Sequence, residues 1–138
     1  MNHIQSPDTT DPGIERELLA KGLTAPRVTP ADIEAAIASE HYFTAAQGDA
    51  KAQEDAAFAG GSLNGEQARP IPAPLSLLTF CVLVLRNGFV VTGESACASP
   101  ENFDAEIGRK IARENAKQKL WPLLGYALKE RLHEGANE

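Results

Sequence analysis

The chain has 138 residues, of which 43% are hydrophobic and 23% are charged, and its formal net charge is -6. These values are typical of a globular protein that is large enough to bury a core of its own. The acidic balance argues against non-specific binding of duplex nucleic acid, which needs a dense surface of Lys and Arg. No segment resembles a signal peptide, and the longest apolar run, LLTFCVLVL, is about half a membrane span. We therefore expect a cytoplasmic protein.

The N-terminal part combines a polar start with two short helical patterns. Residues 1–26 are predicted to be a flexible segment, with a short helix in GIERELLAKG that stops at Gly22. Residues 27–138 are predicted to form a single α+β domain. Thr29 and Pro30 mark the start of a helix that we expect to run to about Glu40. The following HYFTA favours an extended strand.

Residues 47–74 change in composition. Gly, Ala, Gln and Pro dominate, and the apolar periodicity is lost. This pattern predicts a long loop or a partly disordered, flexible linker inserted in the domain. An Ala-rich helical turn near Asp49 to Phe58 is the alternative.

The clearest signal is a β-hairpin. LSLLTFCVLVL is predicted to be a strand, Asn87 and Gly88 a type I′ turn, and FVVTGES the returning strand. The first strand has apolar residues on both faces, which indicates that both faces are covered, by helices or by a second copy of the chain. Because two strands alone are marginally stable, the sheet needs a further strand from HYFTA, from the linker or from another subunit.

A long helix follows the hairpin. Ser99 is predicted to cap it and Pro100 to start it. Phe103, Ile107 and Ile111 repeat every four residues, and an adjoining strip is formed by Ala112, Ala116 and Leu120. Together the two strips are predicted to be a core-facing stripe. Pro122 predicts a kink or a break near Trp121. The whole pattern predicts an α+β fold: a small sheet containing the hairpin, packed with a long kinked C-terminal helix and a short N-terminal helix.

No catalytic set, metal site or cofactor motif is predicted. His3, His41 and His133 stand in no local arrangement with Cys or Ser, and neither a P-loop nor a CxxC pair is present. Cys97 precedes a helix start, where a thiol can have a lowered pKa, although a small buried residue closing the loop explains it as well. An enzyme that uses Cys97 is a third hypothesis for this chain, ranked after the two binding functions that are described below.

The candidate binding residues lie on and around the long helix. Arg109 and Arg113 are four residues apart, so they share a helix face and could hold phosphate oxygens. Their alternative role is to complement acidic neighbours such as Glu106 on the helix surface. Phe89 could stack on a base or pack in the core. Polar contacts to a base or a ribose could come from two further side chains, Asn102 and Asn115.

Several short motifs in the second half of the chain resemble a known family. They are the NGF turn, GES-C, P-NF--EIG--IA and the LWPLLGY kink, and LTAPRVTPADIEAAIASEHYFTA matches in the first half. On these residues the chain is identified as a member of the N4 gp49/Sf6 gene 66 family of small phage and prophage proteins. The family name records a genomic origin and implies no activity.

A looser similarity, in size, element order and phage origin, is to the viral anti-Thoeris sponge proteins. Those proteins bind cyclic ADP-ribose isomers, and some bind cyclic oligonucleotides, as multimers. The similarity implies a homo-oligomeric counter-defence protein that sequesters a nucleotide-type ligand in the cytoplasm of the infected or lysogenic host. In this reading Phe89, Asn102, Arg109, Arg113 and Asn115 form the site. The alternative is a protein that binds a host protein through its C-terminal helix.

Overall fold

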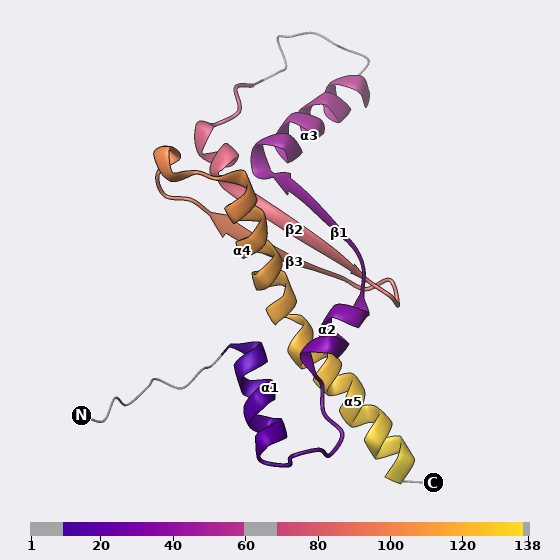
Figure 1. Ribbon diagram of the computed structural model, residues 1–138. Helices are drawn as coiled ribbons and strands as arrows, with labels where there is room; N and C mark the ends of the chain where they lie inside the picture. The colour runs from indigo at the N-terminus through magenta and orange to yellow at the C-terminus, as the bar shows by residue number, and fades with distance from the viewer. Residues whose placement is uncertain (1–9, 60–68, 137–138) are drawn as a thin grey trace, which may run out of the picture. The chain divides into compact units, whose positions relative to one another are not determined.

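The protein is described by a computed structural model that covers residues 10–59 and 69–136 (Figure 1). The chain divides into two compact units, Ile37–Lys119 and a second unit made of Met1–Ala36 with Leu120–Glu138. The predictions of a flexible start at residues 1–9 and of a flexible linker at residues 60–68 fall outside the described residues. The predicted domain boundary after residue 26 stays a prediction.

The larger unit is an antiparallel sheet with a helix on one face, which confirms the α+β prediction. The strand order is β1-β2-β3, with β1 at Ile37–Thr44, β2 at Leu78–Leu85 and β3 at Val90–Ala96. Helix α4, Ala105–Gln118, lies across the sheet (Figure 1). The third strand comes from the HYFTA segment, which was one of the three predicted sources.

The hairpin between β2 and β3 forms as predicted, but its turn differs. Among the described residues, only Gly22 and Gly88 have positive φ, so Asn87 cannot occupy a type I′ turn. Instead, the Leu85 N–H donates to the Phe89 carbonyl, which leaves a three-residue loop that closes on Gly88 at φ 88°. The Asn87 side chain accepts a bond from the Phe89 N–H and so stabilises this loop.

Alternation along β2 divides the sheet into two unlike faces. The face beneath α4 buries Thr79, Cys81, Leu83 and Leu85. The opposite face, which we call the open face, carries six large apolar side chains that are partly exposed: Phe43, Leu78, Phe80, Val82, Val84 and Val90. Phe43 and Phe80 pair across the strands with ring centres 5.5 Å apart.

The core-facing stripe predicted for helix α4 is confirmed for its alanines and wrong for its isoleucines. Ile107 is 55% exposed and Ile111 is 47% exposed, whereas Gly108, Ala112 and Ala116 are buried. Thus the adjoining strip of small residues faces the sheet. A helix can approach a strand closely only where side chains are small, and here α4 rests directly on β3.

Two further boundaries differ from the prediction. Helix α4 begins at Ala105, because Asp104 is extended and its carboxylate accepts the Ile107 N–H at 3.0 Å. Pro100–Asn102 forms a separate 3-10 turn, η2, and Ser99 makes no side-chain capping bond there. Asp caps a helix as well as Ser does, and in the structure the capping residue is Asp104.

The kink or break expected near Trp121 is confirmed as a break at Lys119, between α4 and helix α5, Leu120–Ala136. Proline has no N–H, and its ring clashes with the carbonyl four residues earlier, which here belongs to Gln118. The break therefore follows Gln118 directly, and Pro122 occupies the first turn of α5, where a missing N–H costs little.

In the second unit, α1 spans Asp11–Ala20 and is followed by Gly22 at φ 68°, in agreement with the predicted stop. Helix α2, Pro30–Ala36, starts as predicted with reciprocal bonds between Thr29 and Asp32. It ends four residues earlier than predicted, because Ile37 to Glu40 pair with β2. Ladder formation here outweighs the helix propensity of Ala and Glu.

The predicted loop at residues 47–74 contains a helix, α3, at Ala45–Ala59, and a 3-10 turn, η1, at Ala73–Leu77. The alternative of an Ala-rich turn was therefore the better one. Thr44 and Gln47 exchange side-chain-to-backbone bonds as a capping box. Arg69 then binds the Asp49 carboxylate with both terminal nitrogens.

Candidate ligand-binding site

Helix α4 places the two predicted arginines one turn apart, with different surroundings. The Nε atom of Arg113 donates to Glu40 Oε2 on β1 at 2.8 Å, and the two side chains are 28% and 41% exposed. Arg109 is exposed, and it makes no hydrogen bond or ion pair with any residue that the structure describes. Arg109 is therefore the arginine that is available to an anion. Arg113 could bind one only while it stays bonded to Glu40 or after it breaks that ion pair.

The neighbouring charges on α4 are engaged locally. Lys110 pairs with Glu106 at 3.2 Å, and Lys117 pairs with Glu114 at 3.6 Å. The predicted pairing of Glu106 with a basic neighbour therefore involves Lys110. Exposed pairs of this kind contribute less than about 1 kcal/mol each.

Below Arg113, three side chains form a cluster that the sequence did not reveal. Tyr42 and Cys81 are opposite one another on β1 and β2, and Glu40 is two residues from Tyr42 on the same face. Burial, and then the nearby Cys81 and Glu40, raise the pKa of Tyr42 to about 12. Burial also raises the pKa of the Cys81 thiol, against the opposing effects of Tyr42 and Arg113. Both groups are therefore protonated at neutral pH, and Cys81 is fully buried, so this thiol is not a nucleophile.

Only the register between β1 and β2 brings this cluster together. The two strands are separated by more than thirty residues in the sequence, so a local pattern could not predict the contact. The usable signal was Glu40 and Tyr42 at alternate positions, which places both on one face once the segment is a strand. The helix predicted through Glu40 concealed that signal.

The two asparagines have different settings. Asn115 Nδ2 donates to the Glu94 carbonyl at 2.8 Å, which fastens α4 to β3. Asn102 is exposed in η2, with its backbone N–H bonded to the Ser99 carbonyl. Asn115 therefore has a structural role in the single chain, whereas the Asn102 side chain points to no partner among the described residues.

Phe89 is 54% exposed at the hairpin loop, at the start of β3. Asn102 follows the end of β3. Because β3 has seven residues, these two positions are separated by roughly 20 Å along the strand. The five predicted residues therefore do not converge on one small ligand within a single chain.

The cysteines and the described acidic residues form no other candidate site. Cys81 and Cys97 are both free thiols, and the Cys97 thiol donates to the Ser99 carbonyl at 3.1 Å. Within residues 10–59 and 69–136, no three His, Cys, Asp or Glu side chains gather as metal ligands would. None of the helices in these residues has the length and apolarity of a membrane span.

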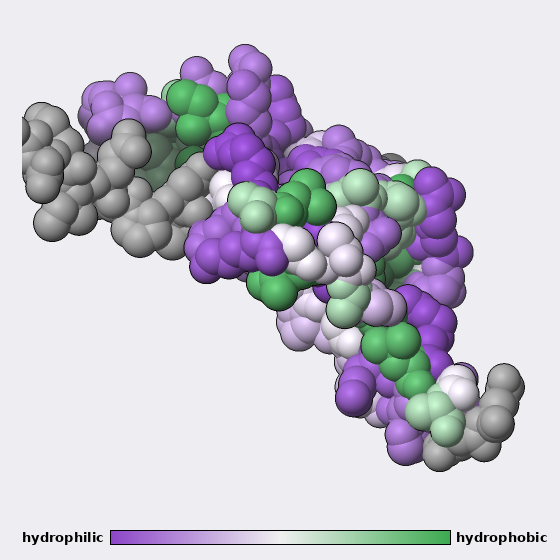
Figure 2. Space-filling model, turned by 60° about the horizontal axis from the view of Figure 1, so that its bottom comes forward, coloured by the Kyte–Doolittle hydropathy of each residue, from purple (hydrophilic) through white to green (hydrophobic). Residues whose placement is uncertain are grey.

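Hydrophobic side chains on the surface are scattered. On the face shown in Figure 2, green hydrophobic residues occur in small groups between purple hydrophilic ones. Several large apolar side chains of the described chain are nevertheless well exposed, among them Ile107, Ile111, Leu123 and Tyr126. Single exposed apolar residues are normal on a protein surface and identify no site by themselves.

Comparison with known proteins gives one match. Neither the curated proteins nor the solved structures include a significant match to this chain. A family model does match, over residues 28–132, and it is described as the phage protein (N4 Gp49/phage Sf6 gene 66) family. This range includes the whole sheet, α4 and most of α5. The chain therefore belongs to the phage protein (N4 Gp49/phage Sf6 gene 66) family.

Proposed function

We propose that this phage-family protein binds a nucleotide second messenger of host immunity and sequesters it without chemical conversion. A cyclic ADP-ribose isomer or a cyclic oligonucleotide is the expected class of ligand. The observation that carries the proposal is the row of Arg109 and Arg113 on α4, with Arg109 exposed and unpaired among the described residues. Guanidinium groups bind phosphate oxygens through two parallel bonds, which suits this ligand class.

The separation of the other candidates supports a site shared between copies of the chain. Phe89 and Asn102 lie at opposite ends of β3, so one chain presents the aromatic and the polar candidates on different sides. In a homo-oligomer, Phe89 of one copy would stack on the base while Arg109 of another copy holds the phosphates. The protein acts as a binding protein in this proposal, because the buried Cys81 and the bonded Cys97 provide no activated nucleophile.

The first experiment is a thermal-shift screen against cyclic ADP-ribose isomers and cyclic oligonucleotides. A ligand that binds only the folded protein raises its melting temperature by mass action. Chromatography of the ligand after heat release must then return it unchanged. A ligand that emerges cleaved would show an enzyme, and a screen without any stabilisation would contradict sequestration.

The arginines provide the second test. Arg109→Ala should weaken binding of the screened ligand by roughly ten- to a hundredfold, because a charge-assisted contact contributes about 1.5–3 kcal/mol. Lys110→Ala removes the same charge from the next residue, and it should change the affinity much less. If both variants weaken binding equally, α4 supplies only a general positive field and Arg109 is no contact.

A second candidate function is binding of a host protein through the C-terminal helix. It is favoured by the pair of Leu123 and Tyr126, which are both exposed and, being three residues apart, lie next to one another on α5. In that case Tyr126→Ala would abolish the protein contact, and no nucleotide in the panel would stabilise the fold.

A further inference from the structure

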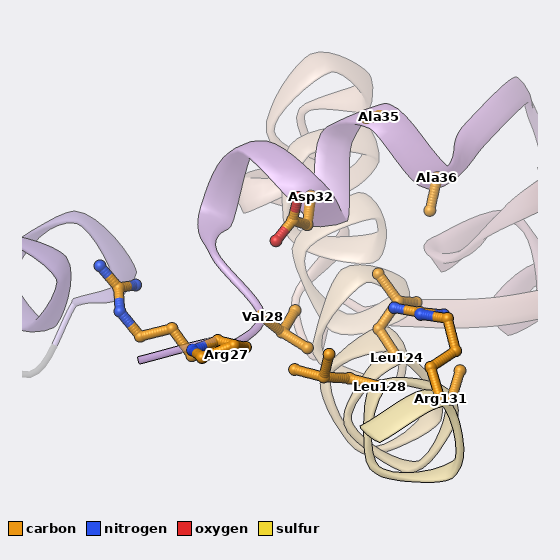
Figure 3. Close-up of a pocket in the computed structure, with 10 residues that line it drawn as sticks. Arg27, Val28, Asp32, Ala35, Ala36, Leu124, Leu128 and Arg131 are labelled. Carbon is orange, nitrogen blue, oxygen red and sulfur yellow. The ribbon is translucent and has the colours of Figure 1, made fainter. Parts of the chain in front are cut away.

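A pocket of about 420 Å³ lies in the unit that contains α2 and α5 (Figure 3). Ten residues line it, and all belong to Met1–Ala36 or to Leu120–Glu138, so the pocket is complete within one compact unit. Its volume falls in the range of small-molecule sites, which is about 300–1,000 Å³. The pocket is separate from the α4 arginines and does not depend on the function proposed for them.

The lining of the pocket combines an apolar wall with polar and charged groups. Val28 comes from the segment before α2, and Leu124 and Leu128 come from successive turns of α5. Alanines of both helices complete this part of the wall. A wall of this kind favours an apolar ligand body over water.

Two of the charged groups at the pocket are already engaged. Arg27 donates to both carboxylate oxygens of Glu15, at 2.5 and 2.7 Å, and its Nε donates to the Leu23 carbonyl. The Asp32 carboxylate accepts the Thr29 N–H at 2.9 Å. Arg27 therefore forms a fixed part of the wall, and Asp32 adds a negative charge that disfavours a polyanion.

Arg131 is different. It extends from α5 with its guanidinium turned toward the pocket (Figure 3). It is exposed, and it has no hydrogen bond or ion pair within the part of the chain that the structure describes. An unpaired guanidinium beside an apolar wall is complementary to a single anionic group on an apolar body.

We infer that this pocket binds a small amphiphilic monocarboxylate, with its carboxylate on Arg131 and its apolar chain against Val28, Leu124 and Leu128. One guanidinium matches one carboxylate. Asp32 also lines the pocket, and its negative charge disfavours the several charges of a nucleotide phosphate chain more than the single charge of a carboxylate.

The test uses the full chain and octanoate as the probe, followed by ¹H–¹⁵N NMR. Saturable shifts are expected at the amides of Val28, Leu124 and Leu128. Arg131→Gln should weaken octanoate binding by about tenfold, as expected when a charge-assisted contact is lost. Lys129→Gln removes the same charge from α5 outside the lining and should leave the affinity unchanged.

Two neutral or inorganic probes complete the design. Octanamide should bind the native chain no better than octanoate binds the Arg131→Gln variant. Inorganic phosphate should fail to displace octanoate. The inference is overturned if no saturable shifts occur at the pocket, if Lys129→Gln weakens binding as much as Arg131→Gln does, or if phosphate competes for the site. The spectrum of each variant without ligand shows whether its fold is intact.

Discussion

Gly93 shows how one residue fixes the packing of the larger unit. It lies in the middle of β3, opposite Cys81, and it is buried beneath α4. A Cβ atom at this position would overlap the Ala112 carbonyl oxygen and the Ala116 nitrogen. Both are backbone atoms, so no side-chain rotation relieves the overlap. The glycine of the family motif GES-C is thus the contact point of helix and sheet.

Gly93→Ala should therefore destabilise the protein by more than about 3 kcal/mol, since α4 would have to move away from β3. The control is Gly125→Ala, because a Cβ at this α5 position meets no atom within 4 Å. That change should stabilise the helix by about 0.5–1 kcal/mol. Urea unfolding followed by circular dichroism measures both. Equal stability of the two variants would show that α4 does not rest on Gly93.

Tyr42 makes a pH-dependent contribution at the same scale. Its folded-state pKa of about 12 exceeds the ordinary value of 10.0, so the unfolded chain loses the phenol proton first as the pH rises. Stability is therefore unaffected below pH 10 and falls between pH 10 and 12. Tyr42→Phe should remove this part of the decline. If the ultraviolet titrations of the native protein and of Tyr42→Phe differ by a phenol that ionises near pH 10, the shift is contradicted.

At the scale of elements, α4 illustrates which parts of the fold could be predicted from the sequence. The two strands of the hairpin were predicted correctly, although its turn type was not, because long apolar runs beside an Asn-Gly pair are strong local signals. The face of α4 was predicted only in part, because Phe103, Ile107 and Ile111 also have the spacing of a core stripe and were included with the small residues. The small residues of α4 face the sheet because Gly93 of β3 lies beneath them. That contact depends on how helix and strand are aligned in the folded protein.

The helix boundaries show the same contrast between local signals, which could be read from the sequence, and distant contacts, which could not. Thr29 was recognised as a cap, whereas the equally regular box of Thr44 and Gln47 was missed within an Ala- and Gly-rich stretch. Arg109 and Arg113 were found from their spacing, but the Glu40 partner of Arg113 came from a strand that had been predicted as helix. Pairs that are distant in sequence were therefore the part of the candidate site that sequence could not supply.

A pair of truncations tests the orientation of the elements. Leu83→Ala should cost about 2–5 kcal/mol, because Leu83 is fully buried under α4. Ile107→Ala should change stability by no more than about 0.5 kcal/mol, because the side chain is mainly exposed. The only tryptophan, Trp121, lies in the other unit, so circular dichroism is preferable to fluorescence as the probe. A large loss for Ile107→Ala would restore the stripe predicted from sequence.

At the scale of the whole molecule, the open face of the sheet bears on assembly. Val82 and Val84 alternate with the buried Cys81 and Leu83 along β2, so the strand is apolar on both sides. Helix α4 covers one side. On the other side, a Cβ atom at Gly48 of α3 would lie 3.8 Å from the Phe43 ring, while Val90 is largely exposed. The central strand thus presents more apolar surface than its own unit covers.

We expect the chain to form a homo-oligomer through this open face. Sedimentation velocity at tens of micromolar should give a species heavier than the 14.7 kDa chain. Val82→Asp should shift it toward monomer, because an unpaired carboxylate in a buried apolar interface is strongly unfavourable. Ile107→Asp adds the same charge on the outer side of α4 and should leave the assembly intact. A native chain that sediments as a monomer would contradict the prediction, and it would also require that the proposed nucleotide site be complete within one copy. If Ile107→Asp dissociates the assembly and Val82→Asp does not, then α4 rather than the sheet forms the interface.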